Sequence, residues 1–344
     1  MDVPFKRAKM KDRLAALAAK GVYIGTSSWK YEGWLGQLYT AARYQKSGKP
    51  PRESSTQGLF PGLTAETVST SPVKIDKKRF EQECLSEYAE VFKTVCVDSA
   101  FYTFPTESSL HKLADAVPDG FRFGFKVTDD ITIRKFPHLD RFGSRAGKSN
   151  PNFLDAELFQ GAFLRRCEAI RPKVGILMFE FSRFWPGDYK NERDFVKDLD
   201  GFLGRLPGDW PYAVEIRNRD WLVPEYFDCL SRHDVTHVYN SWEAMPSMAE
   251  QMAMPGSRTN PKRIAARFLL KPGRRYEAAV KQFQPYDKVK EPNPEARRAG
   301  WSLVSVGRDA SGCELYIYVN NRLEGNALET IDGMLDATSE KLVP

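Results

Sequence analysis

A carboxylate and a guanidinium stand two residues apart in the stretch AVEIRNRDW, where Glu215 and Arg217 continue an apolar run. Side chains alternate along a strand, so these two groups share one face while Val214 and Ile216 share the other. A buried charge requires a partner, and a Glu–Arg pair supplies one. The pair is therefore either a sealed structural ion pair or a hydrated part of a site. The position of the strand end in the fold decides between the two.

The elements around this pair alternate between two kinds. Eight short β-like runs occupy residues 22–29, 94–101, 121–128, 174–181, 212–218, 235–242, 263–270 and 314–321. Segments with helical spacing lie between or after them, at 76–92, 106–117, 155–170, 191–206, 224–233 and 326–340. Eight strands alternating with helices predict an α/β fold, a TIM (β/α)8 barrel with parallel strands in a single domain.

The ends of barrel strands are the expected place for chemistry, because the loops that follow the strands of a (β/α)8 barrel form one mouth. Glu215 and Arg217 then face this mouth, and we predict a hydrated pair in which Glu215 is the acid, base or charge-stabilising group. Arg217 would orient it. Asp98 is a further catalytic candidate. The substrate-binding candidates by position are Trp29, Tyr31, Tyr102, Lys126, Glu180, Arg267, Asn320 and Asn321.

Charge and aromatic residues also favour an anionic partner at this mouth. The net charge of +6 is mild, but cations gather after the first, third and seventh runs. They are Arg43, Lys46, Lys49, Arg52, Arg134, Lys135, Arg141, Arg145, Lys148, Lys271, Arg274, Arg275 and Lys281. Aromatic rings interleaved with cations are typical of sites for nucleotides, single-stranded nucleic acid or phosphorylated sugars. Ordinary loop packing beneath solvated lysines and arginines is the alternative.

Other chemistries have less support. His233 and His237 are four residues apart, but they straddle a helix end and a strand start, far from the mouth, so we predict no metal there. Asp98, Glu180 and Glu215 could together hold Mg²⁺. Glu180 and Glu215 could also be the two acids of a glycoside hydrolase. Neither a G-x-S-x-G elbow nor a phosphate-binding P-loop motif occurs.

The remaining composition indicates a cytoplasmic globular protein. No run of about 18 apolar residues could span a membrane. The basic N-terminus lacks the apolar core of a secretory signal. The five scattered cysteines suggest reduced thiols. We predict an amphipathic helix in residues 1–20, with Phe5, Met10, Leu14 and Leu17 on one side, and then a barrel domain over 21–340. A long loop is expected at about 40–75 and a second one at 129–154.

Four stretches resemble the YecE-like family, domain of unknown function 72. They are YIGTSSWKYEGWLGQLY, VDSAFYTFP, AVEIRNRDWL and YIYVNNRLEGNA, in that order along residues 22–328. The resemblance implies a TIM barrel and supplies no activity, because that family is functionally uncharacterised. Its motif positions here are Thr26, Ser27, Trp29, Tyr31, Trp34, Ser99, Phe101, Tyr102, Glu215, Arg217, Trp221, Asn320 and Asn321. One departure is that Cys96 stands where the family commonly has Glu, so a catalytic acid would be missing or replaced by Asp98.

These observations together predict an enzyme whose barrel mouth binds a phosphate- or nucleotide-containing substrate. Phosphodiester or phosphoryl hydrolysis is favoured over glycoside hydrolysis, because cations outnumber convergent carboxylates. In this reaction Lys126 and Arg267 would clamp the anion, while Asn320 and Asn321 would orient the substrate. A non-catalytic nucleotide- or nucleic-acid-binding module is the rival interpretation. The sequence does not fix the substrate, the oligomeric state or any need for a cofactor.

Overall fold

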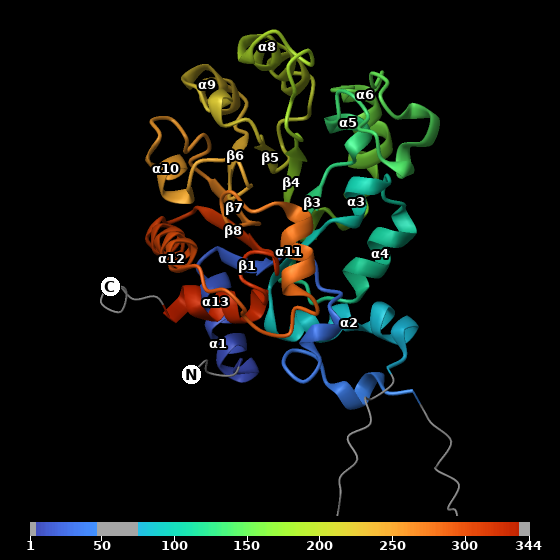
Figure 1. The fold of residues 1–344 in the computed structure, drawn as a ribbon, viewed down its shortest axis with the longest axis vertical. Coiled ribbons are helices and arrows are strands. Elements are labelled where there is room, and N and C mark those ends of the chain that lie inside the picture. Colours follow the sequence, from blue (N-terminus) through green and yellow to red (C-terminus); the bar gives the residue numbers. More distant parts are fainter. Residues whose placement is uncertain (1–4, 47–74, 337–344) are drawn as a thin grey trace, which may run out of the picture.

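Eight parallel strands close into a barrel in chain order in the computed structural model, which describes residues 5–46 and 75–336. The predicted TIM barrel is therefore confirmed (Figure 1). The strands are β1 (Val22–Thr26), β2 (Thr94–Val97), β3 (Arg122–Lys126), β4 (Val174–Glu180), β5 (Tyr212–Glu215), β6 (Thr236–Asn240), β7 (Arg263–Phe268) and β8 (Glu314–Val319). Each strand starts within a predicted run.

Helices surround the strands in Figure 1. The longer ones are α1 (Arg7–Ala18), α2 (Lys77–Val91), α4 (Glu107–Asp115), α8 (Glu192–Leu203), α9 (Pro224–Arg232), α10 (Met248–Ala253), α11 (Tyr276–Phe283), α12 (Pro294–Asp309) and α13 (Ala327–Asp336). Side-chain caps fix several of their starts: Asp76 accepts from the backbone of Arg79 at α2, and Asn191 accepts from that of Asp194 at α8. Helix α11 follows β7 and lies in front of the strands in this view.

Several predicted elements differ in detail. The run at 94–101 ends as a strand at Val97, because the chain turns there into the short helix α3 (Ser99–Tyr102). Within 155–170 the helix is broken into α6 (Ala156–Leu158), a π-helical turn over Phe159–Leu164 and α7 (Arg165–Cys167). The predicted loop at 129–154 contains α5 (Asp129–Thr132) and a small apolar core of its own.

At the N-terminal side of the barrel, Met10 and Leu14 of α1 are buried and Leu17 packs against the core. The predicted loop at 40–75 can be compared only at its two ends. Residues 41–44 form a short 3₁₀ helix with Tyr44 buried, whereas residues 47–74 lie outside the described part of the chain.

The interior of the barrel is filled by side chains from alternate strand positions. They form a compact apolar cluster of Cys96, Ile176, Met178, Ala213, Val238, Ala265, Tyr316 and Tyr318. Two large tyrosines from β8 fit because glycines face them: a Cβ on Gly124 would lie 2.3 Å from the Tyr318 hydroxyl oxygen, and Gly175 similarly faces Tyr316. The interior is thus a packed plug, and polar groups can be reached only at its ends.

We expect Gly124→Ala to destabilise the protein by about 1–3 kcal/mol, because its new methyl group would overpack the plug against Tyr318. Urea unfolding measures this change. Gly120→Ala is the matched control, since a Cβ at Gly120 has no neighbour within 4 Å. Equal midpoints for the two variants would contradict this account of the interior.

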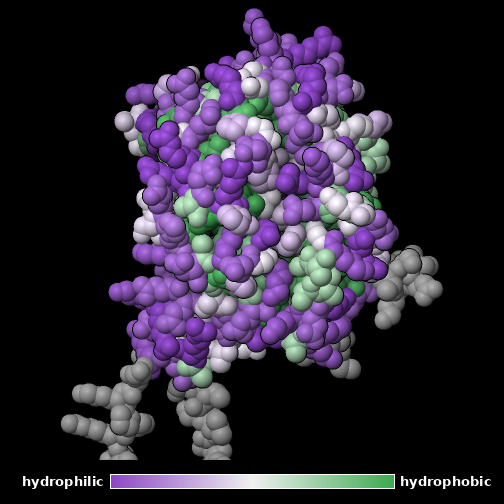
Figure 2. Space-filling model, turned by 180° about the vertical axis from the view of Figure 1, so that it is seen from behind, coloured by the Kyte–Doolittle hydropathy of each residue, from purple (hydrophilic) through white to green (hydrophobic). Residues whose placement is uncertain are grey.

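The opposite face of the molecule is mostly hydrophilic, with apolar surface in separate patches (Figure 2). None of the helices in the described part of the chain is both long and apolar enough to cross a membrane.

Candidate functional site

A layer of charged side chains closes the barrel interior at the carboxyl ends of the strands. The strand period of two places Glu180 above Met178, Glu215 above Ala213 and Arg267 above Ala265. Lys126 occupies the last position of β3, and Glu180 and Glu215 are register partners across β4 and β5. These residues and Arg217, just beyond β5, are called the charged layer below.

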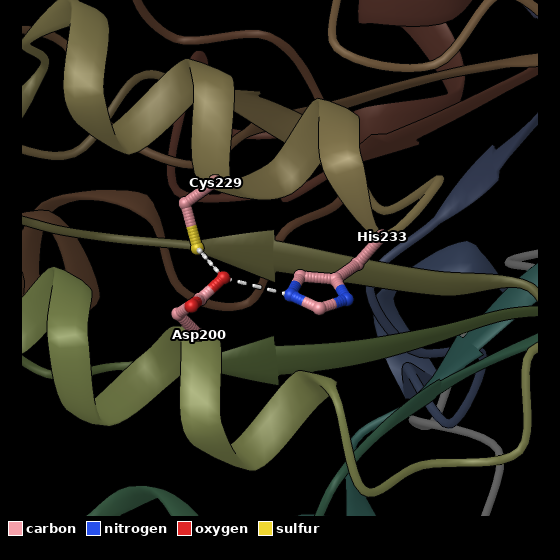
Figure 3. Close-up of side chains that lie close together, drawn as sticks. All are labelled: Asp200, Cys229 and His233. Carbon is pink, nitrogen blue, oxygen red and sulfur yellow. Dashed lines mark hydrogen bonds and ion pairs between the residues drawn. The ribbon is translucent and has the colours of Figure 1, made fainter.

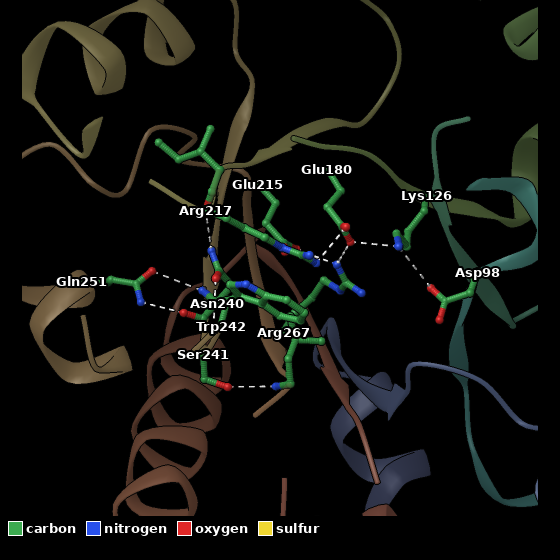
Figure 4. A network of polar contacts seen from close by, with 12 residues as sticks. Asp98, Lys126, Glu180, Glu215, Arg217, Asn240, Ser241, Trp242, Gln251 and Arg267 are labelled. Carbon is green, nitrogen blue, oxygen red and sulfur yellow. Dashed lines mark hydrogen bonds and ion pairs between the residues drawn. The ribbon is translucent and has the colours of Figure 1, made fainter. Parts of the chain in front are cut away.

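The charged layer is one connected ion-pair network (Figure 4). Arg267 Nη1 lies 2.5 Å from Glu180 Oε2 and 2.7 Å from Glu215 Oε2. Arg217 Nη2 lies 2.7 Å from Glu180 Oε1, and its Nε lies 3.3 Å from Glu215 Oε1. Lys126 Nζ is 2.9 Å from Glu180 Oε2. Every oxygen of the two carboxylates therefore contacts a cation.

Burial makes this network electrostatically strong. Glu215 is 0% exposed, Glu180 2% and Arg267 3%. Burial by itself would raise the pKa of Glu180, but attraction to Arg217, Lys126 and Arg267 holds the pKa of this carboxyl well below its usual value. Three cations face two carboxylates in the layer, and Asp98, 4.0 Å from Lys126 Nζ, is a third carboxylate beside it.

Aromatic rings cover the two cations nearest to solvent. The Trp242 ring centroid lies 3.8 Å from the Arg217 guanidinium carbon, and the Phe101 ring centroid lies 3.9 Å from Lys126 Nζ. Asn240 holds the backbone that leads to Trp242. Its side-chain oxygen accepts from the Trp242 backbone N–H at 3.3 Å, and its side-chain amide donates to Ile216 O. Phe101 is also one of the family motif positions found in the sequence.

Asp98 is the carboxylate beside the charged layer that remains partly open to solvent. Its side chain is 35% exposed, and its Oδ1 stands 4.0 Å from Lys126 Nζ. Cys96 lies beneath it and donates from Sγ to the same oxygen at 3.7 Å. Burial raises the pKa of the Cys96 thiol well above its usual value, so Cys96 does not supply the ionised group that a Glu would bring there.

The prediction that the Glu215–Arg217 pair is hydrated is wrong. Glu215 is fully buried, and the Arg217 side chain is 11% exposed beneath Trp242. The physical reason is that β5 ends at Glu215, whose inward side chain meets Arg267 from across the barrel. Nor do these residues suit Mg²⁺, because arginine or lysine occupies every oxygen of Glu180 and Glu215.

Most of the other predicted residues lie on the β8–β1 side of the mouth. Trp29 is buried and its indole Nε1 has no acceptor among the described residues. Tyr31 packs on Trp34, with 4.8 Å between ring centroids. Asn320 accepts from the backbone and side chain of Arg322, while Asn321 accepts from the backbone of Ala327 at the start of α13. Asn321 thus has a structural task.

Buried donors without a protein acceptor gather at three neighbouring strand ends. Arg267 Nε on β7, Asn321 Nδ2 after β8, and Ser27 Oγ and Trp29 Nε1 after β1 are all in this state within the described chain. Since Arg, Trp and amide N–H groups can only donate, acceptor-rich partners such as water or anions are what these groups require.

Many of the predicted loop cations are neutralised locally. Arg43 pairs with Glu83, Arg134 with Asp198, Arg141 with Asp129, Arg145 with Asp130, and Lys271 and Arg274 with Glu291. The field at the mouth therefore comes less from the loops than the sequence suggested. Lys49 and Arg52 lie outside the described residues.

Three exposed aromatic rings on the segments that follow β2, β4 and β7 each have an arginine beside them. Arg141 lies 5.0 Å from Tyr102, Arg183 lies 4.6 Å from Trp185, and Arg322 lies 4.4 Å from Tyr276, measured from guanidinium carbon to ring centroid. We call these six residues the aromatic–arginine rim. Of these six residues, only Tyr102 was predicted from the sequence as a substrate-binding residue. The Arg-x-Trp spacing of Arg183 and Trp185 was a sequence signal for the second pair.

The family comparison fits the motifs noted above. A sequence model described as "Protein of unknown function DUF72" matches residues 75–343. The chain belongs to the DUF72 family. YecE-like is another name for this family, so the resemblance seen in the sequence is confirmed. No curated protein matches the chain.

Solved DUF72 structures share the fold of this chain. A DUF72 family protein from Enterococcus faecalis V583, solved at 3.10 Å, is 17% identical, with a TM-score of 0.56 over 91% of this chain and 94% of that one. One from Thermotoga maritima MSB8 is 18% identical, with a TM-score of 0.52 over 91% and 96%. At these identities the likeness concerns the barrel alone.

Proposed function

We propose that the barrel mouth binds a phosphate-containing anion and that the protein is a hydrolase acting on a phosphodiester or phosphoryl group. The observation that carries this proposal is the set of buried donors without a protein acceptor in the described chain, Arg267 Nε, Asn321 Nδ2 and Trp29 Nε1, at neighbouring strand ends of the mouth. Donors of this kind, beside buried cations, favour an acceptor-rich anionic ligand at the nearest accessible point. The accessible side of the layer is at Asp98, whose side chain is 35% exposed and lies 4.0 Å from Lys126 Nζ.

Each charged residue has a proposed role in this reaction. Asp98, the partly exposed carboxylate, would accept a proton from the water that attacks phosphorus. The bond from phosphorus to the leaving oxygen would break, and that oxygen would take a proton from solvent. Lys126 and Arg217 would stabilise the charge that develops on the phosphoryl oxygens. Glu215, fully engaged with arginines, would orient Arg217 rather than exchange protons itself. Glu180 and Arg267 would hold the other charged residues in place through their ion pairs. The substrate would be surrounded by Trp29, Tyr31, Tyr102, Asn320 and Asn321.

The aromatic–arginine rim supports a nucleotide or nucleic acid as the source of the phosphate. Bases stack on exposed rings while neighbouring arginines contact the backbone. A cavity of about 690 Å³ next to the rim, between the loops after β3 and β4, adds Arg134, Lys135 and His138 to Arg183 and Trp185. This volume suits a ligand of nucleotide size.

Glycoside hydrolysis is less well supported by the site. It requires one carboxyl group that keeps its proton near neutral pH. The pKa of Glu180 is instead lowered, because attraction to its three cations outweighs the effect of burial. A non-catalytic binding module is the rival function, because Glu180 and Glu215 are both buried. An Asp98 variant that loses turnover but keeps binding would distinguish an enzyme from a binding module.

The cytoplasmic location is likewise a proposal. All five cysteines are buried and free in the structure, which suits a reducing compartment.

Lys126→Met tests the anion site directly. We expect binding of a fluorescent oligonucleotide or nucleotide to weaken about tenfold or more at low salt, because one charge-assisted contact is lost. The slope of log affinity against log salt should fall by about one. Fluorescence anisotropy over a salt series measures both.

Lys20→Met is the matched control, because it removes the same charge from an exposed position next to the start of β1. No binding by the parent protein at low ionic strength would contradict the proposal. So would equal affinities for the Lys126 and Lys20 variants.

A further inference from the structure

Three side chains with metal-binding chemistry meet between α8 and α9 (Figure 3). Asp200 comes from α8, while Cys229 and His233 come from α9 and the residue after it. His233 Nε2 lies 2.8 Å from Asp200 Oδ1, and Cys229 Sγ donates to the same oxygen at 3.8 Å. Their ligand atoms all lie within 4.8 Å of one another, and this is the one such group in the described residues.

We propose that Asp200, Cys229 and His233 bind a divalent transition metal of the zinc class. Thiolate, imidazole and carboxylate are the three donors that Zn²⁺ takes in proteins, at about 2.0–2.3 Å from the metal. Tetrahedral ligands at these bond lengths stand about 3.3–3.6 Å apart. The observed separations of 2.8 and 3.8 Å bracket that range, so small side-chain rotations would admit the ion.

The local structure favours this arrangement for a reason visible in the sequence. Cys229 and His233 are four residues apart, which places them on one face of α9. Asp200 faces them from the neighbouring helix. The C-x-x-x-H spacing of Cys229 and His233 is visible in the sequence. His237, the other histidine of that stretch, is buried elsewhere, against Tyr226.

A catalytic cysteine does not explain the cluster. A nucleophilic thiol requires the imidazole as its base, whereas the Cys229 thiol faces the carboxylate.

A structural clamp between the helices is the serious rival. Arg232 Nη2 lies 2.9 Å from Asp200 Oδ1, so three donors share a single oxygen. This guanidinium competes with a cation for the carboxylate. The Arg232 side chain is 58% exposed and free to move to the other oxygen or into water. Its removal should therefore strengthen metal binding, which a pure clamp does not predict.

Cobalt(II) titration of the full chain is the test, because a thiolate ligand produces a near-ultraviolet charge-transfer band. We expect a band that saturates at one cobalt per chain and is displaced by one equivalent of zinc. Cys229→Ser should abolish the band, and Cys167→Ser, which alters another buried helical thiol, should leave it unchanged. Arg232→Gln should tighten cobalt binding by about tenfold.

Two results would overturn the proposal. One is the absence of a band at stoichiometric cobalt in both the parent and the Arg232→Gln protein, with circular dichroism showing both folded. The other is a band that survives in Cys229→Ser, which would place the metal elsewhere. The cluster lies near the start of β6, away from the charged layer, so its test is independent of the function proposed for the mouth.

Discussion

Glu215→Gln should lower the free energy of unfolding by about 3 kcal/mol or more, the cost typical of breaking a buried ion pair from one side. The glutamate is fully buried and pairs with Arg267 at 2.7 Å and Arg217 at 3.3 Å. A neutral amide would leave the charged layer with three cations and one carboxylate. Because Glu215 is 0% exposed, bulk solvent does not screen this change. Urea unfolding followed by tryptophan fluorescence measures the loss.

The matched control is Glu314→Gln at the other end of the barrel. Glu314 pairs with Arg263 at 3.4 Å, but both side chains are about a third exposed. Solvent screening makes such a pair worth less than about 1 kcal/mol. If the two variants unfolded at the same urea concentration, Glu215 would be hydrated after all, and its role as a proton-exchanging group would return.

The barrel could be predicted from the sequence because the patterns that specify its strands and helices are local. Alternating short apolar runs and amphipathic segments specify βα units, and eight of them specify closure. The residues at which strands and helices end were harder to predict. The run at 94–101 reads as continuous β-structure, yet the backbone turns into α3 after Val97, where Asp98 leaves the sheet. Local composition does not record that turn.

The sequence showed which residues form the site, but it did not show that they are buried. Strand parity and position identified Lys126, Glu180, Glu215 and Arg267 as mouth residues, and the structure brings them into contact. Their burial could not be read from the sequence, because it depends on which side chains meet across the barrel and on Trp242 and Phe101 covering the cations. Long-range packing of this kind leaves no periodic trace.

The same packing explains why Asp98 rather than Glu215 is the stronger candidate for proton transfer. A general base must be reachable by water and able to change its protonation state. Both oxygens of Glu215 contact arginines, and attraction to its cations outweighs burial and lowers the pKa of Glu180. Asp98 has a single cation, Lys126, at the longer distance of 4.0 Å, and a third of its side chain is exposed.

Asp98→Asn should therefore reduce hydrolysis of a phosphodiester substrate by about 10²–10⁴-fold, the range typical of losing a general base. Binding of a non-hydrolysed nucleotide should persist or tighten, because the change removes a negative charge beside Lys126. Single-turnover hydrolysis and anisotropy on the same protein separate the two effects. Asp119→Asn, an exposed change before β3, is the control. Equal turnover in both variants would remove Asp98 from the mechanism. Retained binding without any parent hydrolysis would instead establish the mouth as a binding module, since the charged layer would then act only to hold the anion.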